Sequence, residues 1–485
     1  MIEINPKIHD RFSLEFKVGF VAEGDKPTSE FQMNTWIYIP ETLDVNRYTY
    51  FKDSFYRDTR SYLRFITPSY RLSELADDYI LPYKRLRQAC YNMVENLSEK
   101  TRKAYETEIK MYASIVKSSI RDGYVEVVNS QDEAEKAKLA DLYLINIYKV
   151  LQLYRSVRVL FDGARGKGAI AEPFDFGDEF ISNVVEQHVF RLVEWLKESG
   201  FEWTDQFKVR IDDLLKKEDE YRKSRGFLRV EKESDDRNRK FVYRAGQLKK
   251  YLESNLYLPV HKRSNTVFLE QVAFSFAAGV SMIFATVVSF AFQQTYGNFT
   301  LPFFIALVIS YMFKDRIKDL IRNYFANRLG SRFYDYIIHI RVNNRKLGWC
   351  KEGFDFVSSQ KISRHVQEKR ARKSPLVLGK GVDEQIMQYR KKVHLRPKEV
   401  ARLSEYPLAG INEIIRYNLS EFMRKMDNPQ VPLYVNEGGA DLDRTLGDKV
   451  YYINFVIQCI YDEQREYRRY KVCLSQAGIK GIQEI

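Results

Sequence analysis

Two segments of the chain have residue types that could contact a nucleotide or a metal ion. The first is a glycine-rich loop at residues 163–168, with the sequence GARGKG. A P-loop requires G-x-x-x-x-G-K-[ST] between a strand and a helix, because its backbone amides surround the phosphates and its hydroxyl binds magnesium. Here the loop follows a helical pattern, and no Ser or Thr follows Lys167. We interpret it as a connection between helices.

The second segment is the acid pair Asp441 and Asp443, which follows Gly438 and Gly439. Paired carboxylates hold metals in nucleotide-transferring enzymes, but such sites keep the glycines and the acids on separate elements. A calcium loop would require glycine at the sixth position, where this chain has Leu446. The pattern predicts a polar turn before a strand.

The remaining candidates for catalysis or metal binding are the histidines and cysteines. None of them falls in a C-x-x-C, H-x-x-x-H or H-E-x-x-H spacing, and no G-x-S-x-G elbow occurs. We therefore predict no catalytic residue, no metal site and no cofactor. The sequence leaves an enzyme open but favours a protein that is not one. The residues are His9, His188, His261, His339, His365, His394, Cys90, Cys350, Cys459 and Cys473.

One segment concentrates positive charge. Residues 361–402 contain thirteen Lys and Arg against four acids, a net charge of +9 out of +13 for the whole chain. Such a patch attracts nucleic acid, oligonucleotides or anionic lipid, and a solvated surface with no ligand is the remaining alternative. The predicted anion-binding residues are Lys369, Arg370, Arg372, Lys373, Arg390, Lys391 and Lys392.

The elements that position these residues begin with an uncharged stretch from Gln271 to Phe313. A helix needs about 20 apolar residues to cross a bilayer. The stretch predicts a transmembrane hairpin with spans at 272–292 and 296–313, followed by an amphipathic stem. A buried hairpin of a globular protein is the alternative.

Small residues recur every fourth position in the first predicted span. They are Ala273, Ala277, Ser281, Ala285 and Ser289. Small residues allow close approach of helices in lipid. We predict that this stripe packs helices together, either the two spans of one chain or the protomers of a homo-oligomer, and a pore lined by Ser281 and Ser289 is a further alternative.

Basic residues flank both predicted spans, and the loop between them has no charge. By the positive-inside rule both termini are cytoplasmic. We therefore expect an integral protein of the bacterial inner membrane, with the lipid bilayer as a partner.

The rest of the chain predicts an α+β protein. Alternating apolar residues at 12–20 and 31–39 predict an N-terminal β-hairpin, and β-rich runs end the chain, with a helical insertion at about 383–426 and a final strand pair at 450–460 and 467–474. The charge-rich segment 216–240 suits a solvated helix or linker. The predicted domains are 1–43, a β-hairpin region; 44–260, a helical cytosolic domain; 261–332, the hairpin and stem; and 333–485, an α+β domain.

Three functions fit this organisation. The first is a membrane-anchored oligomeric sensor or effector, whose cytosolic domains bind an anionic ligand and change the packing of the hairpins, with pore formation as one outcome. The second is a non-enzymatic scaffold that holds an unknown cytosolic protein partner at the membrane. The third is a membrane-tethered enzyme with an unrecognised site.

Overall fold

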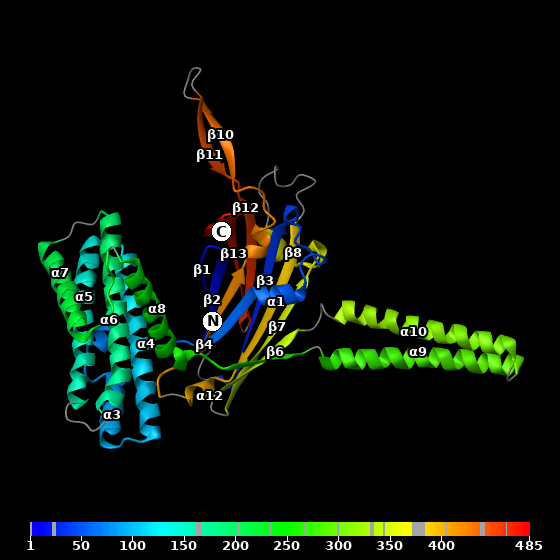
Figure 1. Ribbon diagram of the computed structural model, residues 1–485, viewed down its shortest axis with the longest axis horizontal. Coiled ribbons are helices and arrows are strands. Elements are labelled where there is room, and N and C mark those ends of the chain that lie inside the picture. Colours follow the sequence, from blue (N-terminus) through cyan, green and yellow to red (C-terminus); the bar gives the residue numbers. More distant parts are fainter. Residues whose placement is uncertain are drawn as a thin grey trace. The chain divides into compact units, whose positions relative to one another are not determined.

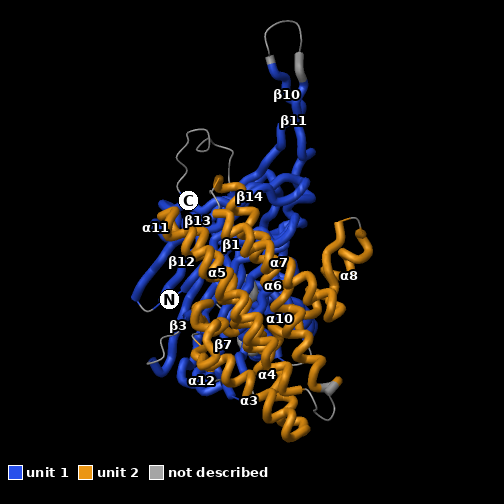
Figure 2. Tube along the Cα trace, turned by 90° about the vertical axis from the view of Figure 1, so that its left-hand side faces the viewer, with its two compact units in different colours: residues 1–64, 258–405, 409–485 blue, residues 65–257, 406–408 orange. Residues whose placement is uncertain are grey.

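A computed structural model shows a chain of two compact units (Figure 1). Unit 1 comprises residues 1–64, 258–405 and 409–485, and unit 2 comprises residues 65–257 and 406–408 (Figure 2). The structure describes residues 2–21, 26–161, 167–200, 204–232, 234–265, 267–297, 300–329, 334–342, 345–370, 384–403, 405–408, 410–436, 442–461 and 463–485.

Unit 1 is built on a large antiparallel sheet. The order of its strands is β14, β13, β12, β3, β8, β7, β6 and β5, so that β3 near the N-terminus pairs with two strands from the C-terminal half. The bounds are β3 (Ser29–Pro40), β5 (Val260–Ser264), β6 (Tyr336–Val342), β7 (Arg345–Phe356), β8 (Glu384–Leu395), β12 (Tyr451–Tyr461), β13 (Gln464–Ser475) and β14 (Gly478–Glu484).

A small sheet covers one face of the large one. Its order is β1 (Ile2–Ile8), β2 (Ser13–Val21), β9 (Gly410–Asn418) and β4 (Thr59–Phe65). The ring of Phe16 lies 5.4 Å from that of Phe455 and 5.5 Å from that of Tyr470, between the sheets. Helix α1 (Lys52–Asp58) adds Phe55, whose ring stacks on Phe354 at 3.9 Å. Burial of such rings stabilises the contact between the sheets.

The N-terminal strands do not form the predicted hairpin. β2 pairs with β1 and β9 in the small sheet, whereas β3 pairs with β8 and β12 in the large sheet. The prediction was wrong because alternation marks a half-buried strand but not its partner. The final pair is confirmed, since β12 and β13 are antiparallel neighbours.

The predicted helical insertion at 383–426 was also wrong. This segment contains β8 and β9, with short helices at α12 (Pro397–Ala401) and α13 (Ser420–Met423). Its run of cations at 390–392 hides the alternation of β8, in which one of the three lysines and arginines points inward. Two further strands, β10 (Gln430–Asn436) and β11 (Leu442–Asp448), pair only with each other in the described structure.

Unit 2 is a helical bundle (Figure 1). Its helices are α2 (Leu72–Leu75), α3 (Leu81–Glu95), α4 (Glu99–Asn129), α5 (Glu133–Ser156), α6 (Lys167–Glu198), α7 (Asp205–Arg225) and α8 (Asp235–Leu252). Helices α5, α6 and α7 are joined by buried charges. Arg155 of α5 donates to both carboxylate oxygens of Glu218 in α7, at 3.0 and 2.6 Å, and to Asp178 in α6 at 3.1 Å.

Helices α9 (Val267–Tyr296) and α10 (Leu301–Leu329) run side by side (Figure 1). The predicted two-helix transmembrane hairpin was wrong. Among the described residues, one helical segment, Gln271–Tyr296, is long and apolar enough to cross a bilayer. Helix α10 has no such segment, because its apolar part ends at Phe313 and charges follow from Lys314. The fold of the described residues is α+β, with a large sheet, a small sheet, the two-stranded β10–β11 ribbon and a helical bundle.

The small-residue stripe lies along the contact of these two helices. Ala273, Ala277 and Ser281 are buried, and Ala285 and Ser289 are half-buried. The hydroxyl of Ser310 in α10 donates to the carbonyl of Ala285 at 3.4 Å. The stripe therefore serves contact within one chain, and contact between protomers stays a prediction, as do a bilayer partner and cytoplasmic termini.

Candidate functional site

The outer face of the large sheet gathers the cations and rings of four neighbouring strands. Successive side chains of a strand point to opposite faces. In β7, Cys350 and Glu352 are buried toward the small sheet, so Trp349 and Lys351 point outward. Antiparallel register carries the same alternation into β5, β6 and β8. We call the following outward residues the basic face: Arg263, His339, Trp349, Lys351, Arg390, Lys392 and His394.

Three rings form a row across β6, β7 and β8. Register places His339 opposite Trp349, and Trp349 opposite His394. The rings of Trp349 and His394 stack with centroids 5.3 Å apart and planes 6° from parallel. The Nδ1 atoms of both histidines lack a hydrogen-bond partner in the part of the chain that the structure describes. The row therefore brings one indole and two imidazole rings together on the outer face of the sheet.

The charge environment keeps one of these histidines neutral. Burial lowers the pKa of His339 below its usual 6.5, and the nearby cations Lys346, Arg341 and Arg263 lower it further. An anion bound beside this ring would offset those cations and raise the pKa again. The pKa of His339 therefore depends on the charge of the ligand that binds to the basic face.

Three cations, Lys351, Lys392 and Arg263, lie one step along the strands from the rings, and Arg390 lies one step further. Lys351 and Lys392 face each other across β7 and β8, and Lys351 lies 4.9 Å from the Trp349 ring centroid. Within the described ranges, no carboxylate pairs with Lys351 or Arg263. Lys392 is 2.9 Å from Glu30. Arg390 lies over the ring of Tyr334 at 5.4 Å.

The basic face has defined edges. On one side, helix α11 (Arg364–Arg370) covers the sheet, and its Val366 packs with Trp36, Tyr38 and Val456. Next to Arg390, neutral polar side chains continue across the strands. Asn34 donates to Gln458 at 2.8 Å, and Gln458 donates to Tyr467 at 2.6 Å. The charged and aromatic part is thus confined to the β5–β8 end.

A glycine allows β7 and β8 to approach beside the ring row. A Cβ atom on Gly348 would lie 2.0 Å from the backbone oxygen of His394. Backbone cannot move aside as a flexible side chain can, so a larger residue would push the two strands apart. Gly348 is therefore required for the stacking of Trp349 on His394.

The inner face of the same strands holds a closed ion cluster. Lys391 is 1% exposed; its Nζ lies 3.0 Å from Glu352 Oε1 and contacts the carboxylate of Glu413 in β9. Lys262 lies 2.9 Å from Glu352 Oε2. Burial raises the pKa of Glu352, but the two ammonium groups outweigh it and lower that pKa to about 2. This cluster joins the two sheets and leaves no charge for a ligand.

The chain was compared with protein-family models, with curated proteins and with solved structures, and none of them matches it. The geometry of the site is therefore the basis on which a function is assigned.

The structure separates the predicted anion-binding residues. Arg390 and Lys392 lie on the basic face, whereas Lys391 is buried in the ion cluster. Lys369 is exposed at the end of α11. Arg370 pairs with Glu384 and lies over Tyr38, away from the ring row. The remaining two, Arg372 and Lys373, lie outside the described residues.

Five members of the basic face were missed by the sequence reasoning. Trp349, Lys351 and His339 are outward residues of strands that pair with β8, and Arg263 and His394 occupy comparable positions. A signal was present, because in the run WCKE, positions 349–352, an aromatic and a cation alternate with a thiol and an acid. Only the strand pairing, however, shows that these residues meet. Among the described residues, no group of three metal-ligating side chains occurs.

Proposed function

We propose that this protein binds single-stranded nucleic acid on the basic face of its large sheet. The supporting observation is the row of rings across three strands with cations beside it. Aromatic side chains on a sheet stack with unpaired bases, and each such contact contributes about 1–3 kcal/mol. Lys351 and Lys392 lie two residues along the strands from Trp349 and His394, roughly 6.5 Å away, and supply electrostatic attraction for the phosphates.

The shape of the face favours single strands over duplexes. A duplex conceals its bases in stacked pairs and admits a helix or a two-stranded ribbon into its major groove. The basic face is instead part of a wide sheet and offers flat rings. The amides of Asn34 and Gln458 are buried and hydrogen-bonded within the protein, so we expect recognition through stacking and charge rather than through base edges.

The residues of the basic face favour binding of nucleic acid over a reaction on it. Its nearest acid, Glu30, is paired with Lys392, and no described cluster could hold a metal beside the rings. We therefore assign a nucleic-acid receptor or scaffold. Any coupling of this binding to α9 and α10, or to a membrane, is a separate prediction.

The experiment is fluorescence anisotropy with a labelled single-stranded oligonucleotide, titrated with the full chain at several salt concentrations. Trp349→Ala should weaken binding by about 1–3 kcal/mol, roughly 5- to 150-fold. Lys351→Glu and Arg263→Glu should weaken it across sequences and reduce the dependence on salt. Lys7→Glu, an exposed lysine of the small sheet, is the matched control and should bind like the wild type.

Two results would overturn the proposal. One is oligonucleotide binding that none of the three variants changes. The other is binding to vesicles of anionic phospholipid without binding to oligonucleotides, which would assign the face to lipid headgroups.

A further inference from the structure

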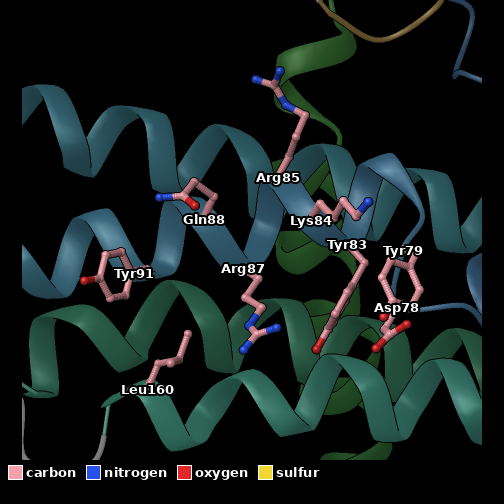
Figure 3. Close-up of a pocket in the computed structure, with 9 residues that line it drawn as sticks. All are labelled: Asp78, Tyr79, Tyr83, Lys84, Arg85, Arg87, Gln88, Tyr91 and Leu160. Carbon is pink, nitrogen blue, oxygen red and sulfur yellow. The ribbon is translucent and has the colours of Figure 1, made fainter.

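Unit 2 contains a hollow that the proposed function does not use. It has a volume of about 800 Å³ and lies along α3 (Figure 3). Lys84, Arg87, Gln88 and Tyr91 recur on α3 at i, i+3, i+4 and i+7, which places them along one face of the helix. Tyr79 from the preceding turn extends this line. A continuous stripe of polar, basic and aromatic residues therefore borders the hollow.

The stripe offers cations that the bundle does not neutralise. Arg87 is exposed, and within the described residues it makes no hydrogen bond or ion pair. Figure 3 shows its guanidinium turned toward the side of α3 on which Leu160 lies. Lys84 is exposed and lies 5.1 Å from the ring centroid of Tyr79. Asp78 is the one acid of the lining.

Arg85, in contrast to Arg87, is held by contacts within the bundle. It donates to Glu108 at 3.0 and 2.6 Å and lies over the ring of Tyr406 at 5.2 Å. Figure 3 shows it pointing away from Arg87. One arginine of α3 thus stabilises the bundle, while the other is available to a ligand.

Two tyrosine rings are exposed beside these cations. Tyr79 is 74% exposed and Tyr91 is 48% exposed. The hydroxyl of Tyr91 donates to Glu95 at 2.7 Å, which orients its ring on the helix. Tyr83 is buried, and its hydroxyl is 3.1 Å from that of Ser156, so it forms the floor. Exposed rings next to unpaired cations form a surface for a flat anionic molecule.

We propose that this hollow binds a nucleoside phosphate. Arg87 and Lys84 contact the phosphate, since a guanidinium matches phosphate oxygens in a bidentate way. Tyr79, the more exposed of the two rings, stacks on the base. The volume falls in the range of small-molecule sites. This is a second site, in a unit separate from the basic face, and it takes a free nucleotide rather than a strand.

The experiment is calorimetric titration of the full chain with ATP, adenosine and inorganic pyrophosphate, in buffer with a chelator. ATP should bind more tightly than either of the others, because it alone uses both the cations and the rings. Arg87→Ala should weaken ATP binding about tenfold or more. Tyr79→Ala should weaken ATP binding and leave pyrophosphate binding unchanged. Lys249→Glu, an exposed lysine of α8, should match the wild type.

Each alternative outcome contradicts the proposal. Equal affinity for ATP and pyrophosphate would reduce the hollow to an anion site without base recognition. ATP binding that neither variant changes, or no ATP binding, would exclude a nucleotide site in this hollow. Arg87→Ala should leave oligonucleotide binding unaltered while Trp349→Ala leaves ATP binding unaltered, so each proposal can fail without the other.

Discussion

Strands β7 and β8 carry positive charge on both of their faces, but the faces differ in what these charges contact. On the inner face, Lys391 has two carboxylate partners and is 1% exposed. On the outer face, Lys351 has no carboxylate partner among the described residues and lies beside a stack of rings. A lysine that is buried and neutralised stabilises the fold, whereas a partly exposed lysine without a carboxylate partner is available to a ligand. A basic segment must therefore be divided by strand alternation before its residues are assigned to binding.

The largest effect should come from breaking the inner cluster. Lys391→Met leaves Glu352 and Glu413 buried with one cation fewer, and we expect a loss of about 3–5 kcal/mol in the free energy of unfolding. Lys392→Met, its neighbour on the outer face, should stay within about 0.5 kcal/mol of the wild type. Urea denaturation followed by tryptophan fluorescence measures both. Equal effects of the two variants would contradict the division between the faces.

Acid should weaken the inner cluster in a defined range. The pKa of Glu352 is lowered from an ordinary value near 4.5 to about 2 in the fold. Its contribution to stability is therefore present above pH 4.5 and lost as the pH falls to about 2, with a size on the order of 3 kcal/mol. The free energy of unfolding of Glu352→Gln should fall less than that of the wild type between pH 4.5 and about 2. Urea denaturation at a series of pH values measures this difference. A parallel decline of both proteins would contradict the assignment.

Gly348→Ala tests how closely the backbones of β7 and β8 must approach beside the ring row. The added Cβ would meet the carbonyl oxygen of His394, and strand separation should cost about 1–3 kcal/mol of stability while disturbing the ring stack. Gly481→Ala in β14 is the control, because nothing lies within 4 Å of its added Cβ. Thermal unfolding and oligonucleotide anisotropy report the two consequences. An alanine at 348 that changes neither would show that the strands adjust without cost.

The smallest expected effect concerns pH and binding on the outer face. The lowered pKa of His339 means that it is neutral near pH 7, and a bound phosphate raises that pKa, so binding takes up a proton. Oligonucleotide affinity should therefore rise as the pH falls from 7 toward 5, by at most about tenfold per pH unit for one proton. His339→Phe keeps a ring and should remove this part of the pH dependence. An unchanged profile would place the nucleic acid away from His339.

Local patterns in the sequence predicted individual strands but not their partners. The alternations at 12–20 and 31–39 correspond to β2 and β3, yet these strands enter different sheets. Alternation tells which residues share a face, whereas the identity of the neighbouring strand depends on contacts between residues hundreds of positions apart. For the same reason the sequence yielded Arg390 and Lys392 but not Trp349.

Burial of charge was the other property that composition concealed. The segment 216–240 predicts a solvated helix, yet Arg222 within it is fully buried and donates to Asn183 at 2.6 Å. For Arg222 the composition was read without the helix that packs against it. The uncharged stretch at 271–313 predicted two spans, but among the described residues one helix is apolar over a sufficient length, because the apolar part of α10 is too short.

The discontinuity of unit 1 has a consequence for its synthesis on the ribosome. β3 is an inner strand of the large sheet, but Tyr38 pairs with Asn454, more than 400 residues later. At typical elongation rates, roughly 20–80 s pass between the emergence of the two partners. During that time unit 2, apart from residues 406–408, has been released and can form its bundle, while β2 and β3 still lack the strands that cover their apolar faces. A nascent chain stalled before residue 384 should therefore bind chaperones through its first 40 residues, and release from them should coincide with completion of the C-terminal strands.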